Sequence, residues 1–354
     1  MLNQNKKRSK QPPLIPVDVA ADLPRLQASY FEKTGTQFKH FFCPFMYRDE
    51  QVQLCMGHVL PESYANCSRA RVAQRADMDN FYGCVAEADY GTLLESQGRT
   101  MSEIVLDKKL LKELRPQLMH DGEEVVYYPY RGEKNLQHTR IAFESAQDER
   151  SIDLVLKKSP TEMQSSLNNN WGFVTEHDFR LAAIATIVKA AFLTMFHLHG
   201  YSWAMSPGGT AIGYDLLGKF FRDNRGNHVT DIKRAMLQAF TPYKHILRPI
   251  VRFGDGDLPR GTLEDGTFGL CFGSNCKPFA QIIYVRIGDH CDGVLLPAAE
   301  NPDSAATYCE FLNNDHEKLK VSHSRFNNAM QCWEVDPKPI TVHWPKKHST
   351  FDFE

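Results

Sequence analysis

Residues 181–198 read LAAIATIVKAAFLTMFHL and form the longest apolar run of the chain. Lys189 interrupts the run near its middle, and a lysine at the centre of a bilayer costs about 2.5–3.5 kcal/mol. The run therefore favours a buried helix over a membrane span. Residues 175–178 (TEHD) have the form of a capping box, and Gly200 stands where such a helix would end. We expect one long buried helix over residues 176–199.

The rest of the chain predicts an α+β fold around that helix, from apolar residues at helical or alternating spacing. Further helices are expected at 22–34, 79–90, 102–120 (broken or kinked at Pro116), 211–221, 231–240 and 303–313. Strands are expected at 38–45, 54–60, 123–130, 139–144, 151–157, 246–253, 266–273, 279–287, 293–296 and 339–344.

A domain boundary is expected near residues 95–100, because the segment before it is poor in long periodic stretches. The predicted parts are a disordered basic tail (1–13), a small cysteine-bearing module (14–98) and a larger mixed α+β domain (99–354). The larger domain would be built around the long helix, and its role is left open.

The composition indicates the cellular compartment and excludes some classes of binding partner. The 354 residues carry 41 Lys and Arg against 43 Asp and Glu, a formal net charge of −2. This balance excludes a uniformly basic coat, so a nucleic-acid site would have to be a local patch. The nine cysteines are odd in number and follow no secretory signal. We expect a cytoplasmic protein with thiols rather than disulfides.

The segment 43–89 holds residue types that suit metal-assisted hydrolysis. His58 lies at the end of an apolar strand, and Asp79-Asn80 are expected on a loop. Glu87 and Asp89 follow Asn80 by seven and nine residues. Carboxylate oxygens can hold a divalent cation, and a neutral imidazole can take a proton from water. The pattern predicts a general base close to a metal ion.

Residues 57–61 (GHVLP) and 79–80 (DN) resemble the strand and the Asp-Asn loop of the HNH, or ββα-metal, endonuclease family. The resemblance covers about 50 residues of the chain. It implies a treble-clef-like ββα module in which His58 is the general base and Asn80 orients it. Asp89, or alternatively Glu87, would hold a catalytic Mg²⁺ or similar ion. Gly57 stands where the family often has a metal-binding Asp or His.

The resemblance also bears on the cysteines of the same segment. Cys43 and Cys55 resemble half of a structural zinc knuckle, which Cys67 and Cys84 could complete. The alternative is a set of buried free thiols, because cysteine is among the most buried residue types. Cations lie between and around these residues, as a phosphate-contacting module requires: Lys39, Arg48, Arg69, Arg71 and Arg75.

The leading hypothesis is therefore a metal-dependent HNH-like endonuclease that hydrolyses phosphodiester bonds of nucleic acid, with DNA favoured over RNA. The alternative is a catalytically inactive, zinc-stabilised treble-clef-like module that binds nucleic acid or protein. Gly57 and the carboxylate in place of the last family histidine favour that alternative. A third hypothesis places an unrelated enzyme on residues 99–354.

Overall fold

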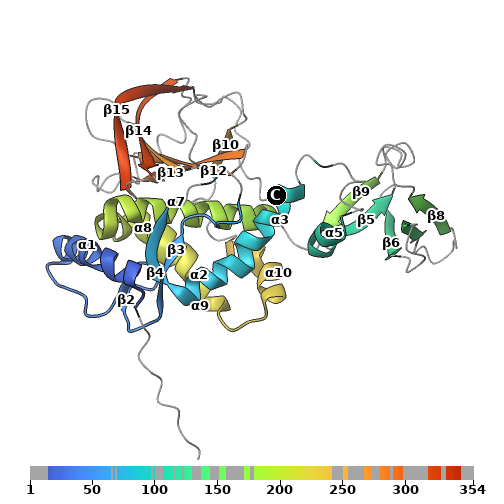
Figure 1. The fold of residues 1–354 in the computed structure, drawn as a ribbon, viewed down its shortest axis with the longest axis horizontal. Helices are drawn as coiled ribbons and strands as arrows, with labels where there is room; N and C mark the ends of the chain where they lie inside the picture. The colour runs from blue at the N-terminus through green and yellow to red at the C-terminus, as the bar shows by residue number, and fades with distance from the viewer. Residues whose placement is uncertain are drawn as a thin grey trace, which may run out of the picture. The chain divides into compact units, whose positions relative to one another are not determined.

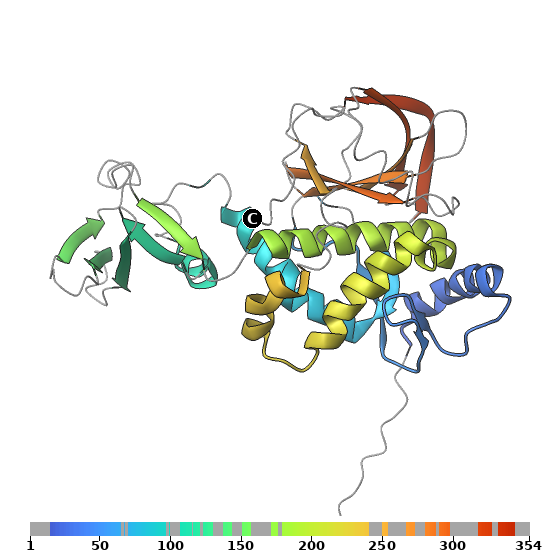
Figure 2. The same cartoon turned by 180° about the vertical axis from the view of Figure 1, so that it is seen from behind.

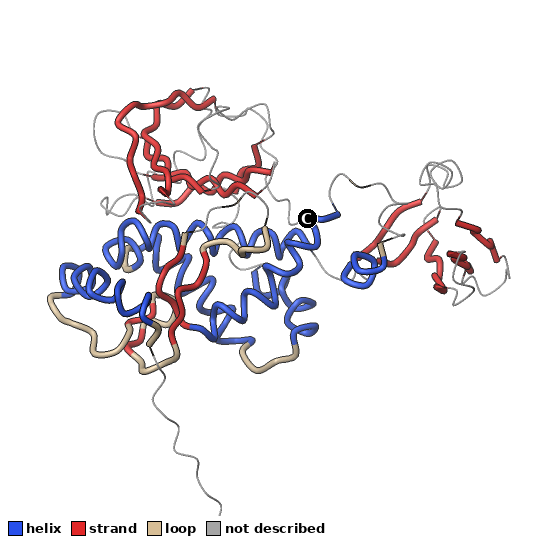
Figure 3. Tube along the Cα trace, viewed as in Figure 1, coloured by secondary structure: helices blue, strands red, loops and turns tan. Residues whose placement is uncertain are grey.

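The computed structural model is a mixed α+β protein with helices and antiparallel sheets (Figures 1 and 3). It divides into two compact units, residues 1–87 with 180–354, and residues 88–179. The structure describes residues 15–64, 67, 70–96, 99, 107–114, 116–120, 123–129, 137–143, 151–156, 171–175, 179–240, 250–253, 267–272, 280–287, 290–297, 318–327 and 332–343.

The first unit holds most of the described helices. They are α1 (Val17–Thr34), α2 (Ala76–Tyr82), the π-helix η1 (Gly83–Glu87), α7 (Phe179–Ala204), α8 (Pro207–Thr210), the π-helix η2 (Ala211–Gly218), α9 (Lys219–Asn224) and α10 (Val229–Phe240). Figures 1 and 2, which view the chain from opposite sides, both show α7 as the longest of them.

α7 forms the core of this unit because it is apolar on all sides. Every residue from Leu181 to Phe196 is buried. Gly200, with φ 56° and ψ −141°, kinks the helix, which then continues to Ala204. A Cβ at Gly200 would lie 2.2 Å from Oγ of Ser29, a hydroxyl that accepts a hydrogen bond from the Tyr201 backbone N–H. Glycine at this position therefore permits the close approach of α1 to α7.

A two-stranded antiparallel hairpin precedes α2. It consists of β3 (Leu54–His58) and β4 (Arg71–Arg75), and α2 begins directly after β4 at Ala76. The chain order is thus strand, strand, helix. A smaller pair, β1 (Phe42–Cys43) with β2 (Arg48–Asp49), lies upstream around a tight turn.

The first unit also contains a six-stranded antiparallel sheet of order β10-β13-β12-β11-β14-β15. Its strands are β10 (Ile250–Phe253), β11 (Thr267–Phe272), β12 (Ala280–Ile287), β13 (His290–Pro297), β14 (Lys318–Asn327) and β15 (Cys332–His343). Each described pairing joins strands that run in opposite directions, as expected for a sheet built from hairpins and returns.

The second unit is a smaller α+β body. It contains α3 (Ala88–Ser96), α5 (Lys108–Leu114) and an antiparallel sheet of order β8-β7-β6-β5-β9. The strands are β5 (Pro116–His120), β6 (Glu123–Pro129), β7 (Gln137–Phe143), β8 (Ser151–Leu156) and β9 (Trp171–Thr175). Leu110, Leu114 and Phe179 form a buried cluster against Leu93.

Three predicted elements differ from the observed ones. The helix predicted over 102–120 is wrong at its end: α5 stops at Leu114 and Pro116 opens strand β5, since proline has no N–H for a helix interior. Thr175 ends strand β9 instead of capping the long helix, which begins at Phe179. Asp79-Asn80 lie inside α2, which begins at Ala76, rather than on a loop.

Other predictions were shorter or longer than the elements found. Of 38–45 only Phe42–Cys43 is a strand, and 339–344 is the end of the longer β15. Strand β14 was not predicted. The predicted tail 1–13 and the predicted helix 303–313 lie outside the described residues.

The segment upstream of residue 87 shares its core with residues after 180. The Tyr47 hydroxyl donates to the Ala204 carbonyl at 2.9 Å, and the Tyr82 hydroxyl donates to the Leu217 carbonyl at 2.7 Å. The Phe45 ring lies 4.6 Å from that of Phe192, between centroids. The compact units therefore meet in sequence at 87/88 and 179/180, whereas the sequence predicted a boundary near residues 95–100.

The apolar character of α7 also bears on the membrane question. Among the described residues, its segment Leu181–Ala204 is long and apolar enough to cross a membrane, but 89% of its apolar window is buried within the structure. The core helix of a globular protein has the same length and composition.

Candidate functional site

The register of the β3–β4 hairpin assigns its side chains to two faces. His58 pairs with Arg71, and Cys55 pairs with Gln74. Because side chains alternate along a strand, His58 and Arg71 share one face while Cys55, Gly57 and Gln74 share the other. We call these the His58 face and the Gln74 face. The two faces present different chemistry.

The His58 face carries a partly exposed cluster of three charged or titratable groups. His58 Nε2 lies 2.7 Å from a carboxylate oxygen of Glu62 and 2.9 Å from Nε of Arg71. Arg71 also donates from Nη2 to the same Glu62 oxygen at 3.0 Å. The hydrogen bond from Arg71, followed by the positive charge of a protonated His58, lowers the pKa of Glu62, so this carboxylate is ionised at neutral pH.

One imidazole nitrogen cannot donate and accept at the same time. With a proton on Nε2, His58 donates to Glu62 and keeps the lone pair of Nδ1 for another proton. With Nε2 bare, the ring accepts from Arg71 instead. The cluster thus provides a polar partner for His58 in either tautomer.

Asn80 is not a partner of His58. It is exposed on α2, and within the described part of the chain the polar contacts of His58 go to Glu62 and Arg71. The expected orienting role therefore has no contact to support it. Glu62, which the sequence reasoning passed over, contacts His58 instead. The spacing of four residues between His58 and Glu62 was the sequence feature that could have predicted this contact.

The Gln74 face adjoins a second polar cluster, centred on Lys189. The Lys189 side chain is 1% exposed, and its ammonium donates to Glu87 Oε1 at 2.7 Å and to Asp79 Oδ1 at 3.1 Å. Burial alone would lower the pKa of Lys189, but Glu87 and then Asp79 outweigh it and raise the pKa. The lysine is therefore charged inside the core, as a buried ammonium requires close carboxylates.

Glu87 is thus located in the interior ion cluster, where its backbone carbonyl also accepts a hydrogen bond from the Tyr64 hydroxyl. Asp89, the other expected metal ligand, is buried on α3. The sequence analysis predicted Glu87 as an alternative ligand of a catalytic ion and treated Lys189 only as an interruption of an apolar run. The position of Lys189 within an apolar run was the sequence feature that indicated a buried carboxylate partner.

Gln74 connects this cluster to the hairpin. Its Nε2 donates to Asp79 Oδ1 at 3.1 Å, while its Oε1 is buried without a hydrogen-bond partner. The side chain also crosses the bare Cα of Gly57. The space that a side chain at position 57 would need is therefore taken by the amide of Gln74.

The four cysteines of the predicted zinc site have different environments. Cys43 is buried at the end of β1. The Cys67 thiol donates to the carbonyls of Pro61 and Tyr64 at 3.4 Å. Cys55 lies beside Asp79, and Cys84 is exposed. Within the described residues, no group of three or more His, Cys, Asp or Glu side chains is arranged to hold a metal ion.

Two of these thiols have raised pKa values. Burial is the main cause that raises the pKa of Cys43 to about 12. Burial and then the negative charge of Asp79 raise the pKa of Cys55 to about 12. Both thiols are therefore protonated at neutral pH.

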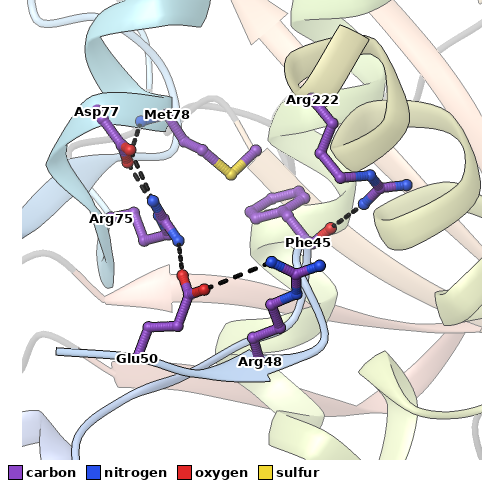
Figure 4. Close-up of polar contacts among 7 residues, drawn as sticks. All are labelled: Phe45, Arg48, Glu50, Arg75, Asp77, Met78 and Arg222. Carbon is purple, nitrogen blue, oxygen red and sulfur yellow. Dashed lines mark hydrogen bonds and ion pairs between the residues drawn. The ribbon is translucent and has the colours of Figure 1, made fainter. Parts of the chain in front are cut away.

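The predicted phosphate-contacting cations are also divided in role. Arg75 is buried and donates to Asp77 through two nitrogens and to Glu50 at 2.6 Å, and Arg48 approaches the other Glu50 oxygen (Figure 4). Arg75 is therefore a structural residue that joins the hairpin to α2 and to Glu50, directly after β2. Lys39 is exposed, and Arg69 lies outside the described residues.

The comparisons with known proteins found no relative of this chain. No family model, no curated protein and no solved structure matches it.

Proposed function

We propose that this chain is an HNH-like endonuclease whose proton-transfer residue is His58. The observation that carries the proposal is the His58–Glu62–Arg71 cluster on one face of the hairpin. It combines a partly exposed imidazole, an ionised carboxylate at 2.7 Å and a guanidinium at 2.9 Å. These are the group types that phosphodiester cleavage needs: a base, a group that stabilises its protonated form, and a cation for phosphate.

In the proposed mechanism, Glu62 accepts the hydrogen bond of Nε2–H and fixes the tautomer of His58. Nδ1 then removes a proton from the attacking water as its oxygen bonds to phosphorus, and Glu62 stabilises the imidazolium that forms. The P–O bond to the leaving oxygen breaks, and that oxygen takes a proton from solvent. Arg71 is placed to donate from its guanidinium to the phosphate oxygens, where negative charge accumulates in the transition state. Glu62 takes the role that the family resemblance assigned to Asn80.

The divalent ion that the resemblance implies does not fit beside His58. Glu87 is bound to Lys189, and the Gln74 face, with Asp79, lies on the other side of the hairpin from the imidazole. No step of the proposed mechanism therefore uses a metal ion.

The test is cleavage of supercoiled plasmid DNA and of single-stranded RNA, with and without Mg²⁺. His58→Ala should reduce cleavage by about 10²–10⁴-fold, the usual contribution of a general base, while circular dichroism stays that of the wild type. His228→Ala, at an exposed histidine, is the matched control and should cleave normally. Equal cleavage by wild type and His58→Ala would overturn the assignment.

A second candidate is a nucleic-acid-binding module without catalysis. The observation that favours it is that Glu87 and Asp79 already neutralise Lys189 and are not free to serve the chemistry at His58. In that case wild type and His58→Ala would bind labelled nucleic acid equally and cleave none. Arg71→Gln would weaken the binding and reduce its salt dependence.

A further inference from the structure

We propose that the His58–Glu62–Arg71 cluster cleaves RNA rather than DNA, without a metal ion and with the ribose 2′-hydroxyl as the nucleophile. This inference rests on the proposed nuclease function and names its substrate class. DNA was the substrate favoured from the sequence. The side chains around His58 favour RNA, because they provide one base and one cation, and this pair suits a nucleophile that the substrate itself carries.

The interior carboxylates of the predicted motif are already bound to a cation. Glu87 lies 2.7 Å from the buried ammonium of Lys189, and Asp79 lies 3.1 Å from it. Their cluster adjoins the Gln74 face of the hairpin, whereas His58 lies on the opposite face. A divalent ion held by these carboxylates would therefore not lie beside the imidazole.

On the His58 face, the cation is the guanidinium of Arg71. It donates from Nη2 to Glu62 at 3.0 Å and from Nε to His58 Nε2 at 2.9 Å. Within the described residues, Nη1 makes no hydrogen bond, and Nε loses its acceptor whenever His58 Nε2 carries the proton. The Arg71 side chain is 42% exposed. Arg71 therefore has donors left for the oxygens of a phosphate.

The base of the cluster is Nδ1 of His58. Glu62 lies 2.7 Å from Nε2 and accepts its proton in a hydrogen bond, which leaves the lone pair on Nδ1. In the part of the chain that the structure describes, Nδ1 has no hydrogen-bond partner, and the side chain is 25% exposed. A hydroxyl group of a bound substrate can therefore reach this nitrogen.

The size of each contribution decides between the two nucleic acids. A general base contributes about 10²–10⁴-fold to the rate, and one oriented hydrogen-bond donor at the developing charge about 10²–10³-fold. DNA must be attacked by water, which many nucleases activate further with a bound metal ion. In RNA the 2′-hydroxyl is held next to the phosphorus, and well-oriented groups within one molecule reach effective concentrations of about 10⁵–10⁸ M. One base and one guanidinium are therefore better matched to RNA.

In RNA the 2′-hydroxyl takes the place of the attacking water. His58 Nδ1 removes its proton as the 2′-oxygen bonds to the adjacent phosphorus, and Arg71 donates to the phosphate oxygens that gain negative charge. The bond from phosphorus to the 5′-oxygen of the next nucleotide breaks, and that oxygen takes a proton from solvent. The products are a 2′,3′-cyclic phosphate and a 5′-hydroxyl, and the imidazolium returns its proton to solvent. DNA lacks the 2′-hydroxyl and cannot follow this route.

The experiment gives the full chain, in EDTA, single-stranded oligonucleotides of one sequence that differ at one nucleotide. This nucleotide is a deoxyribonucleotide, a ribonucleotide or a 2′-O-methyl ribonucleotide. Only the strand with the ribonucleotide should be cut, on the 3′ side of that nucleotide. Mass spectrometry should identify the upstream product as a cyclic phosphate, one water lighter than the linear phosphate.

Variants assign the activity to the cluster. His58→Ala should cut the ribonucleotide strand about 10²–10⁴-fold more slowly, and Arg71→Gln about 10²-fold more slowly. The matched controls are Arg225→Gln and His228→Ala, at exposed residues between α9 and α10. When purified in the same way, both should cut as the wild type does.

The outcomes separate this inference from the nuclease assignment. Cleavage of the all-DNA or 2′-O-methyl strand, a linear phosphate as the first product, or cleavage that requires Mg²⁺ would overturn the inference and leave the assignment standing. Cleavage of none of the strands, in EDTA or in Mg²⁺, would overturn the proposed function and this inference with it. Undiminished cleavage by His58→Ala would also overturn both.

Discussion

The amide of Gln74 lies over the Cα of Gly57, so close that a Cβ on Gly57 would be 1.7 Å from Gln74 Nε2. The two residues belong to neighbouring strands of the β3–β4 hairpin. Any side chain at position 57 must displace Gln74 from its hydrogen bond to Asp79. Glycine at position 57 is therefore required by the glutamine on the partner strand.

We expect Gly57→Ala to lower the free energy of unfolding by about 1–3 kcal/mol, because the added methyl overpacks a buried contact. In the double variant Gly57→Ala/Gln74→Ala the space is open, so Gly57→Ala should cost no more than about 0.5 kcal/mol in that background. Urea denaturation of the four proteins in this cycle measures the coupling. Additive costs would show that Gly57 is required for another reason.

The hairpin also shows where sequence reasoning stops. The sequence placed His58 on a strand and Asn80 after it, but the faces of that strand depend on its partner. Residues 71–75 were not predicted as a strand, so the pairing of His58 with Arg71 could not be anticipated. In this register His58 lies on one face of the hairpin, whereas the cluster that contains Glu87 adjoins the opposite face, although both residues belong to the same predicted motif.

A substitution at Arg75 can show whether the hydrogen-bonding geometry of the guanidinium, rather than its charge alone, stabilises the fold. Its guanidinium donates to both Asp77 oxygens, at 2.9 and 2.7 Å, and to Glu50. Arg75→Lys keeps the charge but cannot reproduce this fork, so it should destabilise the chain by about 1.5–3 kcal/mol. Arg48→Lys, at an exposed arginine 3.7 Å from the same Glu50, is the matched control and should be nearly neutral. Equal melting temperatures for the two variants would contradict this role.

The long helix was predicted well, because an apolar run of that length indicates a buried helix without information from distant parts of the chain. Its partners were not, since Lys189 contacts Glu87 and Asp79 across separations of 102 and 110 residues. Local spacing cannot report such pairings. An isolated lysine in an apolar run does indicate a buried carboxylate somewhere, and here two are present.

His197 should make stability depend on pH. Burial, followed by the positive charge of Arg25, lowers the pKa of His197 to about 4. The unfolded chain therefore binds the proton first as pH falls, and stability is lost between about pH 6.5 and pH 4. The loss between pH 7 and pH 5 is on the order of 1–2 kcal/mol. Denaturation of His197→Asn should show a flatter pH profile, whereas His228→Asn, at an exposed site, should retain the slope of the wild type.

The thiols of the N-terminal segment should differ in reactivity. Cys84 is exposed, whereas the raised pKa values of Cys43 and Cys55, about 12 each, keep both protonated. In native protein at pH 7.5 (roughly one unit below the ordinary thiol pKa), iodoacetamide should label Cys84 well before Cys43 and Cys55. Peptide mass spectrometry measures the order. Protection of all four cysteines, lifted by a zinc chelator, would instead support the predicted zinc site.

The division of the first unit into two separated segments has a consequence for synthesis on the ribosome. Glu87 is made 102 residues before the lysine that neutralises it. At about 5–20 residues per second, roughly 5–20 s pass between the two. During that interval the growing chain has neither α7 nor its ammonium, so the hairpin and α2 cannot close their core. The second unit emerges in the meantime, and it can therefore fold before the unit that begins the chain is complete.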